Sequence, residues 1–374
     1  MAIPGIQQTY DLPTGVKLDV EDAIFLISPF NVPLQGGMGA DGRTALATGS
    51  IFETKYEWLD EQLLTPKTTV ATTVSSTTAT ILNVGAGTGI NFQTGDVLLV
   101  DGEQVQITAY GTTADFLLIS RGFNGSTATT MATGDVVIGV GSGLPEGSVP
   151  PSARAADRVD RYNYSQILGP TAVAVTGTEQ VVQKYGLTST EFDHQVANRI
   201  KEQAITLEQA LLMGQRYAGS PTVGRLLGGL DYWISTNVDS ATTALSDSAI
   251  MVQAQACFDA GGNPDRLVLG SKSKRTVSAI NSTEIRYGQV TNVRGQVVDF
   301  YDTDYGRISV ILDRWCPLSR AFLFERDQAT IETLRPLQFE MLAKTGDFIQ
   351  GQIVGEKGFR FRMQQHAAKF TALT

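Results

Sequence analysis

Two histidines are the first candidates for chemistry, because histidine is the usual general base near neutral pH. They are His194, near the start of a predicted long helix, and His366, in the C-terminal tail. Each could serve as a catalytic base or a metal ligand, or could be a packed or surface side chain. The chain contains neither the GxSxG motif of serine hydrolases nor the GxxxxGK[ST] motif of phosphate-binding loops. We therefore interpret both histidines as structural residues.

A glycine-rich stretch, residues 85–89 (GAGTG), is similar to a loop that cradles phosphate. The dinucleotide-binding fingerprint requires a small residue next and then a helix. Ile90 stands in that position, and a β-prone segment with a Gly-Asp pair follows. We interpret the stretch as a turn.

Charged side chains give two further candidates. Asp96, Asp101, Glu103 and Asp115 could in principle hold calcium, but they lack the spacing of a calcium loop. Solvated carboxylates at β-turns are the simpler interpretation of these four.

Basic residues gather in two places. Lys272, Lys274 and Arg275 form a small basic patch, which we interpret as a surface or subunit contact rather than a nucleic-acid site. Arg360 and Arg362 alternate with apolar residues and could meet acidic groups of a neighbouring subunit. A solvated strand face is the alternative that we favour.

The two cysteines, Cys257 and Cys316, show no CxxC spacing. They predict neither a disulfide framework nor a zinc site. Taken with the other candidates, the sequence predicts no catalytic, cofactor-binding or metal-binding residue, and hence no enzyme.

Composition limits the remaining function classes. The chain has 374 residues, enough for about two to three domains. Its net charge of −9 disfavours classical binding of DNA or RNA, because an acidic chain repels phosphate. Charged residues make up only 18%, which indicates either a surface covered by neighbouring subunits or dilution by a threonine-rich β segment. We find no signal peptide and no apolar stretch long enough to cross a bilayer, so we expect folding in a reducing cytoplasm.

The N-terminal third contains two unusual segments. Residues 1–35 are punctuated by prolines yet apolar, with one short helix expected at Val20–Ile27, so this arm requires a surface to lie on. Residues 71–140 are rich in Thr, Gly and Val. Asp101-Gly102 joins two β-prone runs there and predicts a hairpin. We predict a small all-β domain with strands at the four segments 96–100, 103–108, 116–119 and 136–140.

The rest of the chain mixes helices and strands. Val173 and Val175 alternate in a predicted strand, and a long amphipathic helix follows. We predict that Thr188 and Glu191 form a capping box, and that the helix runs to about Tyr217, roughly 30 residues or about 45 Å. Its expected apolar stripe comprises Phe192, Val196, Ile200, Ala204, Leu207 and Leu211.

The C-terminal half has shorter signals. A helix is predicted at 247–260, with Ser246 as N-cap and Gly261 after its end. A strand is expected at 267–269 and a second helix from about Lys272 to Ile280. Further strands are expected at 297–301 and 308–312. Near the C-terminus, Phe359, Phe361 and Met363 are expected to share one strand face.

Several segments, in their order and spacing, resemble major capsid proteins of tailed bacteriophages with the Hong Kong 97-type fold, in a subfamily with a β insertion. The segments are Leu18–Leu34, Tyr56–Leu63, Tyr162–Gly186, Glu191–Gly214 and Ile331–Asp347, together with a phage-like β repeat at Ser120–Asp135.

The resemblance implies an α+β fold with a long spine helix, an extended loop, axial and peripheral domains, and the small inserted all-β domain. The implied division is an N-terminal arm at 1–35, an extended loop at 36–70 and 141–165, the insertion at 71–140, a peripheral domain with the spine helix at 166–220 and 316–374, and an axial domain at 221–315.

The same resemblance implies a structural protein that assembles through pentamers and hexamers of itself into an icosahedral shell around phage double-stranded DNA, without sequence-specific DNA binding and without a membrane. It also implies location in the virion after assembly in the host cytoplasm. The chain has no helical, charged segment before the arm that could act as a scaffold, which implies a separate scaffolding protein. A portal protein is a further implied partner, and decoration proteins are compatible with the resemblance.

Three alternatives stay open at this point. The chain could form an encapsulin-like shell, or be another phage structural subunit such as a tail tube or an adhesin. It could also be a hydrolase with a carbohydrate-binding β module. Tyr110 and Phe123 are the aromatic residues of the insertion that could serve a carbohydrate site, and they are too few to decide.

Overall fold

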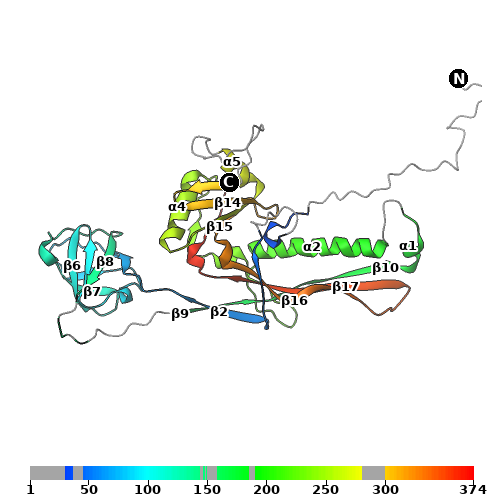
Figure 1. The fold of residues 1–374 in the computed structure, drawn as a ribbon, viewed down its shortest axis with the longest axis horizontal. Helices are drawn as coiled ribbons and strands as arrows, with labels where there is room; N and C mark the ends of the chain where they lie inside the picture. The colour runs from blue at the N-terminus through cyan, green and yellow to red at the C-terminus, as the bar shows by residue number, and fades with distance from the viewer. Residues whose placement is uncertain are drawn as a thin grey trace, which may run out of the picture. The chain divides into compact units, whose positions relative to one another are not determined.

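The structure is a computed structural model that describes residues 30–36, 45–143, 146–147, 149, 158–184, 190–279 and 300–374. The chain divides into two compact units (Figure 1). Met1–Trp58 and Arg161–Thr374 form the first, here called the body, and Leu59–Asp160 form the second, the barrel unit. The helix expected at Val20–Ile27 lies outside the described residues.

A four-stranded sheet forms one half of the body. Its order is β1-β16-β17-β10, with β1 parallel to β16 and the other pairs antiparallel. The strands are β1 (Ala47–Ser50), β10 (Gln166–Thr176), β16 (Ala329–Met341) and β17 (Phe348–Phe361). The alternation at Val173 and Val175 is confirmed, because both side chains are buried. A short helix that the sequence did not predict, α1 (Gly177–Val181), follows β10.

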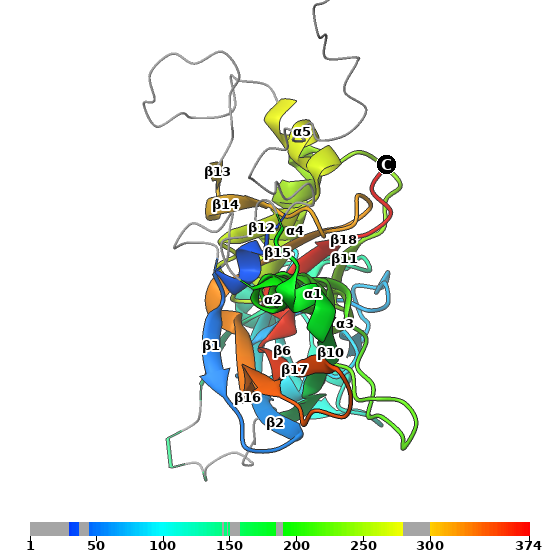
Figure 2. The same ribbon diagram turned by 90° about the vertical axis from the view of Figure 1, so that its right-hand side faces the viewer.

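The long helix α2 (Glu191–Met213) lies along this sheet, and Figure 2, which looks down the helix, shows it covering one face. Its N-cap is Thr190, whose hydroxyl accepts the Asp193 N–H, so the predicted cap at Thr188 was wrong. The predicted end near Tyr217 was also wrong. The helix ends at Gly214, whose ψ of 138° leaves the helical region and whose carbonyl accepts the Gly229 N–H at 2.9 Å.

The 23 residues of α2 span about 35 Å rather than the expected 45 Å. The predicted apolar stripe holds at both ends, where Phe192, Leu207 and Leu211 are buried, and fails in the middle. Ile200 is 40% exposed. The N-terminal half of α2 packs on only a small cluster with Val173, Val175 and the ring of Phe339, which leaves its central turn uncovered.

The other half of the body is a six-stranded sheet of order β11-β18-β15-β12-β14-β13. Its strands are β11 (Asn237–Asp239), β12 (Arg266–Leu269), β13 (Phe300–Thr303), β14 (Gly306–Leu312), β15 (Ala321–Phe324) and β18 (Ala368–Phe370). The helices of this half are α3 (Leu230–Trp233), α4 (Asp247–Asp259) and α5 (Ser271–Ala279). The predicted helix at 247–260 is confirmed with its cap, because the Ser246 hydroxyl accepts the Ala249 N–H.

Short 3₁₀ turns complete the body: η2 (Pro33–Gln35), η5 (Arg326–Gln328) and η6 (Gln364–His366). Phe359 and Phe361 are buried, as expected, but Met363 is 45% exposed. The strand ends before Met363, which adopts a left-handed conformation with φ 47° at the start of η6, and this turn takes its side chain off the apolar face.

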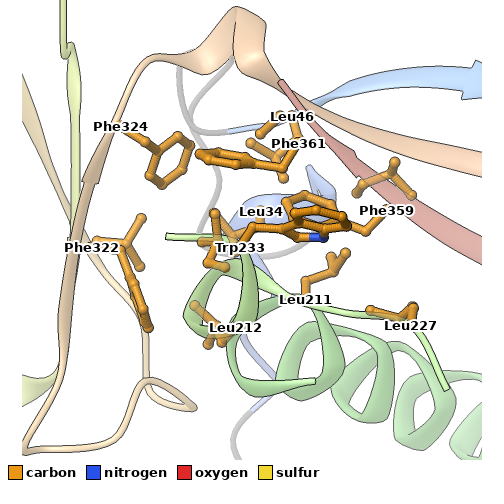
Figure 3. Packing of buried hydrophobic residues seen from close by; sticks show 14 of the residues in the cluster. Leu34, Leu46, Leu211, Leu212, Leu227, Trp233, Phe322, Phe324, Phe359 and Phe361 are labelled. Atoms are coloured by element: carbon orange, nitrogen blue, oxygen red, sulfur yellow. The ribbon is translucent and has the colours of Figure 1, made fainter. Parts of the chain in front are cut away.

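The largest core of the body joins its two sheets through the C-terminal end of α2. Figure 3 shows Leu211 and Leu212 of the helix packed below Trp233, with Phe322 and Phe324 from β15 and Phe359 and Phe361 from β17 around them. Leu34 of η2 is fully buried in the same core. The described segment after residue 29 is therefore built into the body.

The barrel unit contains a six-stranded sheet of order β3-β8-β5-β6-β7-β4. Its strands are β3 (Lys67–Thr69), β4 (Ile81–Asn83), β5 (Asp96–Val100), β6 (Glu103–Tyr110), β7 (Phe116–Ser120) and β8 (Val136–Ser142). A bridge between Val70 and Val84 joins the two edge strands and closes the sheet. The predicted hairpin is confirmed at Asp101-Gly102, where both residues have positive φ, as a two-residue turn of this type requires.

A two-stranded sheet of β2 (Lys55–Glu61) and β9 (Arg158–Tyr164) carries the chain out to the barrel unit and back. The unit boundaries fall inside these two strands.

Candidate functional site

Neither histidine belongs to a catalytic arrangement in the described residues. His194 lies in the first turn of α2, where its Nε2 is 3.1 Å from the Asn198 amide nitrogen. His366 ends η6 and packs on the backbone of Gly262, whose added Cβ would lie 2.4 Å from the His366 Cβ. The described part of the chain also holds no group of three or more His, Cys, Asp or Glu side chains that could hold a metal ion.

The glycine-rich stretch at 85–89 binds a carboxylate of its own chain. The Gly87 and Gly89 N–H groups donate to Asp115 Oδ2 and Oδ1 at 2.9 and 3.0 Å. These are the donors that a phosphate would need, and Asp115 already occupies them. Asp96 similarly accepts the Gln93 N–H at 2.6 Å. Asp96 and Asp115 therefore stabilise turns.

Glu103 was predicted to be a solvated carboxylate, and that prediction was wrong. Its side chain is 0% exposed and forms an ion pair with Arg121, whose Nη2 is 2.7 Å from Oε2. The backbone N–H groups of Gly122 and Thr129 donate to the same carboxylate at 2.9 and 3.0 Å. Burial would raise the pKa of Glu103, but Arg121 and the two N–H groups outweigh burial and lower that pKa.

The basic residues fall into two environments. Lys272 and Arg275 are exposed on α5, whose inward side carries Ser273 and Val277. Arg360 does not lie on a solvated strand face, as we had favoured. Its Nε is 3.2 Å from Oε1 of Glu332, a buried carboxylate on β16. Burial raises the pKa of Glu332, although Arg360 and Arg362 act against it.

Both cysteines are free and buried. Burial raises the pKa of Cys257 and of Cys316 to about 12, so neither thiol is a nucleophile at neutral pH. Of the two aromatic candidates in the barrel unit, Tyr110 donates its hydroxyl to the Phe92 carbonyl, and Phe123 is half-buried in a turn. They do not form an exposed aromatic platform.

The body instead offers surfaces for association. β10 has no neighbouring strand on its outer side within the described residues, and a groove runs along it. Ala172–Thr176 line the groove together with Glu179, Glu191, Gln195 and Arg199. An open edge presents unpaired backbone groups to a further strand. Phe52, on the turn between β1 and β2, is 93% exposed beside a second groove that Lys55 and Arg360 line.

The segment at residues 30–36, here called the root segment, is fixed by buried acids. Leu34 N donates to Glu208 Oε1, and Gln35 Nε2 donates to Glu208 Oε2, both at 2.7 Å. Asp313, which follows β14, is buried next to Glu208 and accepts the Trp315 N–H at 2.8 Å. The Trp315 indole donates to Asn31 O at 2.8 Å.

The sequence interpretation missed Glu208, Asp313 and Phe52. Glu208 carried a signal, because it lies on the apolar side of the predicted helix, four residues after Ala204 and three before Leu211. A charged residue inside an apolar stripe indicates a buried partner. Asp313 and Phe52 have no comparable local pattern.

Comparison with known proteins identifies the family. The profile described as "SU10 major capsid protein" matches residues 5–374. The chain belongs to the SU10 major capsid protein family. The capsid protein is thus a structural subunit of a virion shell, and shell formation makes it homo-oligomeric.

The fold agrees with this family. A structure from Microbacterium phage Oxtober96 is similar with a TM-score of 0.52 at 10% identity, covering 96% of each chain. A structure from Mycobacterium phage Bobi gives 0.51 at 10% identity and 98% of each chain. The capsid of a native GTA particle gives 0.51 at 8% identity and 96% of each chain. A search of curated proteins gave no match to the capsid protein.

No described helix of the capsid protein is long and apolar enough to cross a membrane.

Proposed function

We propose that the capsid protein assembles through pentamers and hexamers into an icosahedral shell around phage double-stranded DNA, with the Hong Kong 97-type division into arm, extended loop, insertion, peripheral and axial domains. The match of residues 5–374 to a family of major capsid proteins carries this proposal. The open edge of β10 and the exposed Phe52 support it, because both are surfaces that neighbouring subunits would cover.

We also propose which proteins the capsid protein assembles with and where in the cell it assembles. Assembly takes place in the host cytoplasm with a separate scaffolding protein and a portal protein, and decoration proteins can bind the finished shell. The shell encloses DNA without sequence-specific binding, and the net charge of −9 supports a shell that does not hold the phosphates tightly. The capsid protein has no catalytic activity in this proposal, and the environments of His194, His366 and the two cysteines support that.

Electron microscopy of the purified chain, alone and with a candidate scaffolding protein, tests the proposal. We expect closed shells or rings of five and six subunits. A monomer at high concentration under both conditions would contradict it. Phe52→Asp should reduce assembly at least tenfold, because burying the new charge at an interface is unfavourable. Glu53→Gln, on the same exposed turn, is the matched control and should assemble normally.

A further inference from the structure

The carboxyl groups of Glu208 and Asp313 are buried side by side, and the proposed role in shell formation does not explain why two acids lie there. Both side chains are fully buried, one on α2 and the other after β14. Each carboxylate of Glu208 and Asp313 lacks an ion-pair partner among the Lys and Arg residues of the described chain. Ionising both of two adjacent buried carboxyl groups without a nearby cation carries a large free-energy penalty, from desolvation and from mutual repulsion.

The hydrogen bonds indicate where a proton must be. Both oxygens of Glu208 accept from the root segment, and Asp313 Oδ1 accepts the Trp315 N–H. Asp313 Oδ2 is buried and has no donor in the structure. A proton held between Asp313 Oδ2 and the neighbouring Glu208 carboxyl group supplies the missing donor and removes one of the two charges.

We propose that Glu208 and Asp313 share one proton and act as a pH-sensitive latch that fixes the root segment to α2. When the proton is lost, the two carboxylates repel each other in a buried site. Release of the root segment lets water reach Glu208 and relieves the repulsion.

The titration behaviour of the pair agrees with this geometry. Burial, followed by the Asp313 charge, raises the pKa of Glu208 to about 8. Burial raises the pKa of Asp313 to about 6. Among the described residues the Cys316 thiol also senses Asp313, and burial and the Asp313 charge keep it protonated. The remaining groups that face the pair, the Leu34 N–H, the Gln35 amide and the Trp315 N–H, do not titrate.

The sign of the pH effect follows from proton linkage. In the latched state Glu208 binds its proton more tightly than it does in water. The released state therefore binds fewer protons between the ordinary pKa of 4.5 and about pH 8, and raising the pH through this range favours release. One proton of difference changes the opening equilibrium about tenfold for each pH unit between about 6 and 8.

Hydrogen exchange of the full-length chain measures this opening. We would follow a peptide that covers residues 30–36 from pH 6 to 9, expressed as protection relative to the intrinsic exchange rate at each pH. Protection should fall about tenfold per pH unit between about 6 and 8. A peptide from β12, a buried strand of the body, should show no such slope, which separates latch opening from global unfolding.

Two variants and a control decide the cause. Glu208→Gln keeps an acceptor for the Leu34 N–H without a charge, and Asp313→Asn keeps an acceptor for Trp315. Glu208→Gln should hold the root segment with protection that no longer depends on pH between about 6 and 8. In Asp313→Asn burial alone still raises the pKa of Glu208, so the slope should remain but lie at lower pH than in the wild type. Glu202→Gln removes an exposed carboxylate of the same helix, paired with Arg199, and should keep the wild-type slope.

Three results would overturn the latch. One is wild-type protection that is flat between pH 6 and 9. Another is an unchanged slope in Glu208→Gln, or a slope in Asp313→Asn that stays in the pH range of the wild type. If neither variant folds, a slope in β12 equal to that of residues 30–36 would show that no separate latch exists. All of these measurements use unassembled chain, so failure to form shells would leave them intact.

Discussion

Replacement of Arg121 by methionine would show how far the barrel unit depends on a single buried ion pair. Arg121→Met removes hydrogen bonds of 2.8 and 2.7 Å to Glu103 and leaves that carboxylate fully buried. Only the Gly122 and Thr129 N–H groups then remain of its present donors. Removing one partner of a buried pair costs about 3–5 kcal/mol. Opening of the barrel unit should therefore increase roughly 10²- to 10⁴-fold.

The same replacement should reverse the pH dependence of stability. In the wild type the pKa of Glu103 is lowered, so its contribution is complete above the ordinary pKa of 4.5 and is lost as the pH falls through the folded value. Without Arg121, burial dominates and raises the pKa of Glu103. The variant then binds a proton more tightly when folded, and its stability decreases as the pH rises above about 4.5. Acidification from pH 7 to 5 should stabilise the variant and leave the wild type unchanged.

Hydrogen exchange of β5 and β6 peptides in the full-length chain measures both effects, with β12 of the body as internal reference. A double variant, Glu103→Met with Arg121→Met, removes both charges and should be more stable than Arg121→Met alone, because no unpaired charge stays buried. A loss below about 1 kcal/mol in Arg121→Met would refute the reasoning, since that is the range of exposed pairs. An unchanged sign of the pH dependence would refute it as well.

Two further outcomes test the turn and the thiols. Asp115→Ala leaves the two backbone N–H groups of the 85–89 turn without their acceptor and should lower local stability by about 1–2 kcal/mol. Hydrogen exchange should become faster in this turn but not in β12. Exchange of the turn at the wild-type rate would contradict the turn-stabilising role. Cys257 and Cys316 should not react with a thiol reagent at pH 8 in the native chain, because burial raises the pKa of each thiol to about 12. Both should react after denaturation. Rapid labelling of the native chain would contradict their burial.

Features that depend on neighbouring residues were predicted well from the sequence. The helix at 247–260 is confirmed within one residue, because Ser246 and Gly261 are local start and stop signals. The Asp101-Gly102 hairpin is confirmed because a tight turn is specified by the two residues that form it. In each case the interaction that decides the structure spans only a few positions of the chain.

Features set by distant contacts were not predicted. The end of α2 is a different case, because Gly214, directly after Met213, is a local stop signal of the same kind as Gly261 and the sequence interpretation passed over it. Glu103 looked like a turn carboxylate because its partner, Arg121, lies at the end of another strand. The residues next to Glu103 in the sequence give no sign of this partner. Only the closed sheet of the barrel unit brings the side chains of Glu103 and Arg121 together.

The site around Glu208 also combines one feature that the sequence indicates with others that depend on distant contacts. Glu208 stands inside the apolar stripe of its helix, so the sequence does contain a sign that it is buried. Its partner Asp313 comes from after β14, and the root segment comes from the other end of the chain. Only the fold brings three such distant segments together, so their joint role could not be derived from spacing.

The two buried acids are stabilised in different ways, and this determines which part of the chain responds to pH. Glu103 is neutralised by the permanently charged guanidinium of Arg121, so its ion pair persists across the neutral range. Glu208 faces a second carboxyl group, and with no Lys or Arg of the described residues beside them, a shared proton neutralises that pair. The barrel unit should therefore keep its structure between pH 6 and 8, while the attachment of the root segment weakens. A pH change in this range would act on the N-terminal end of the body and leave the barrel unit unaffected.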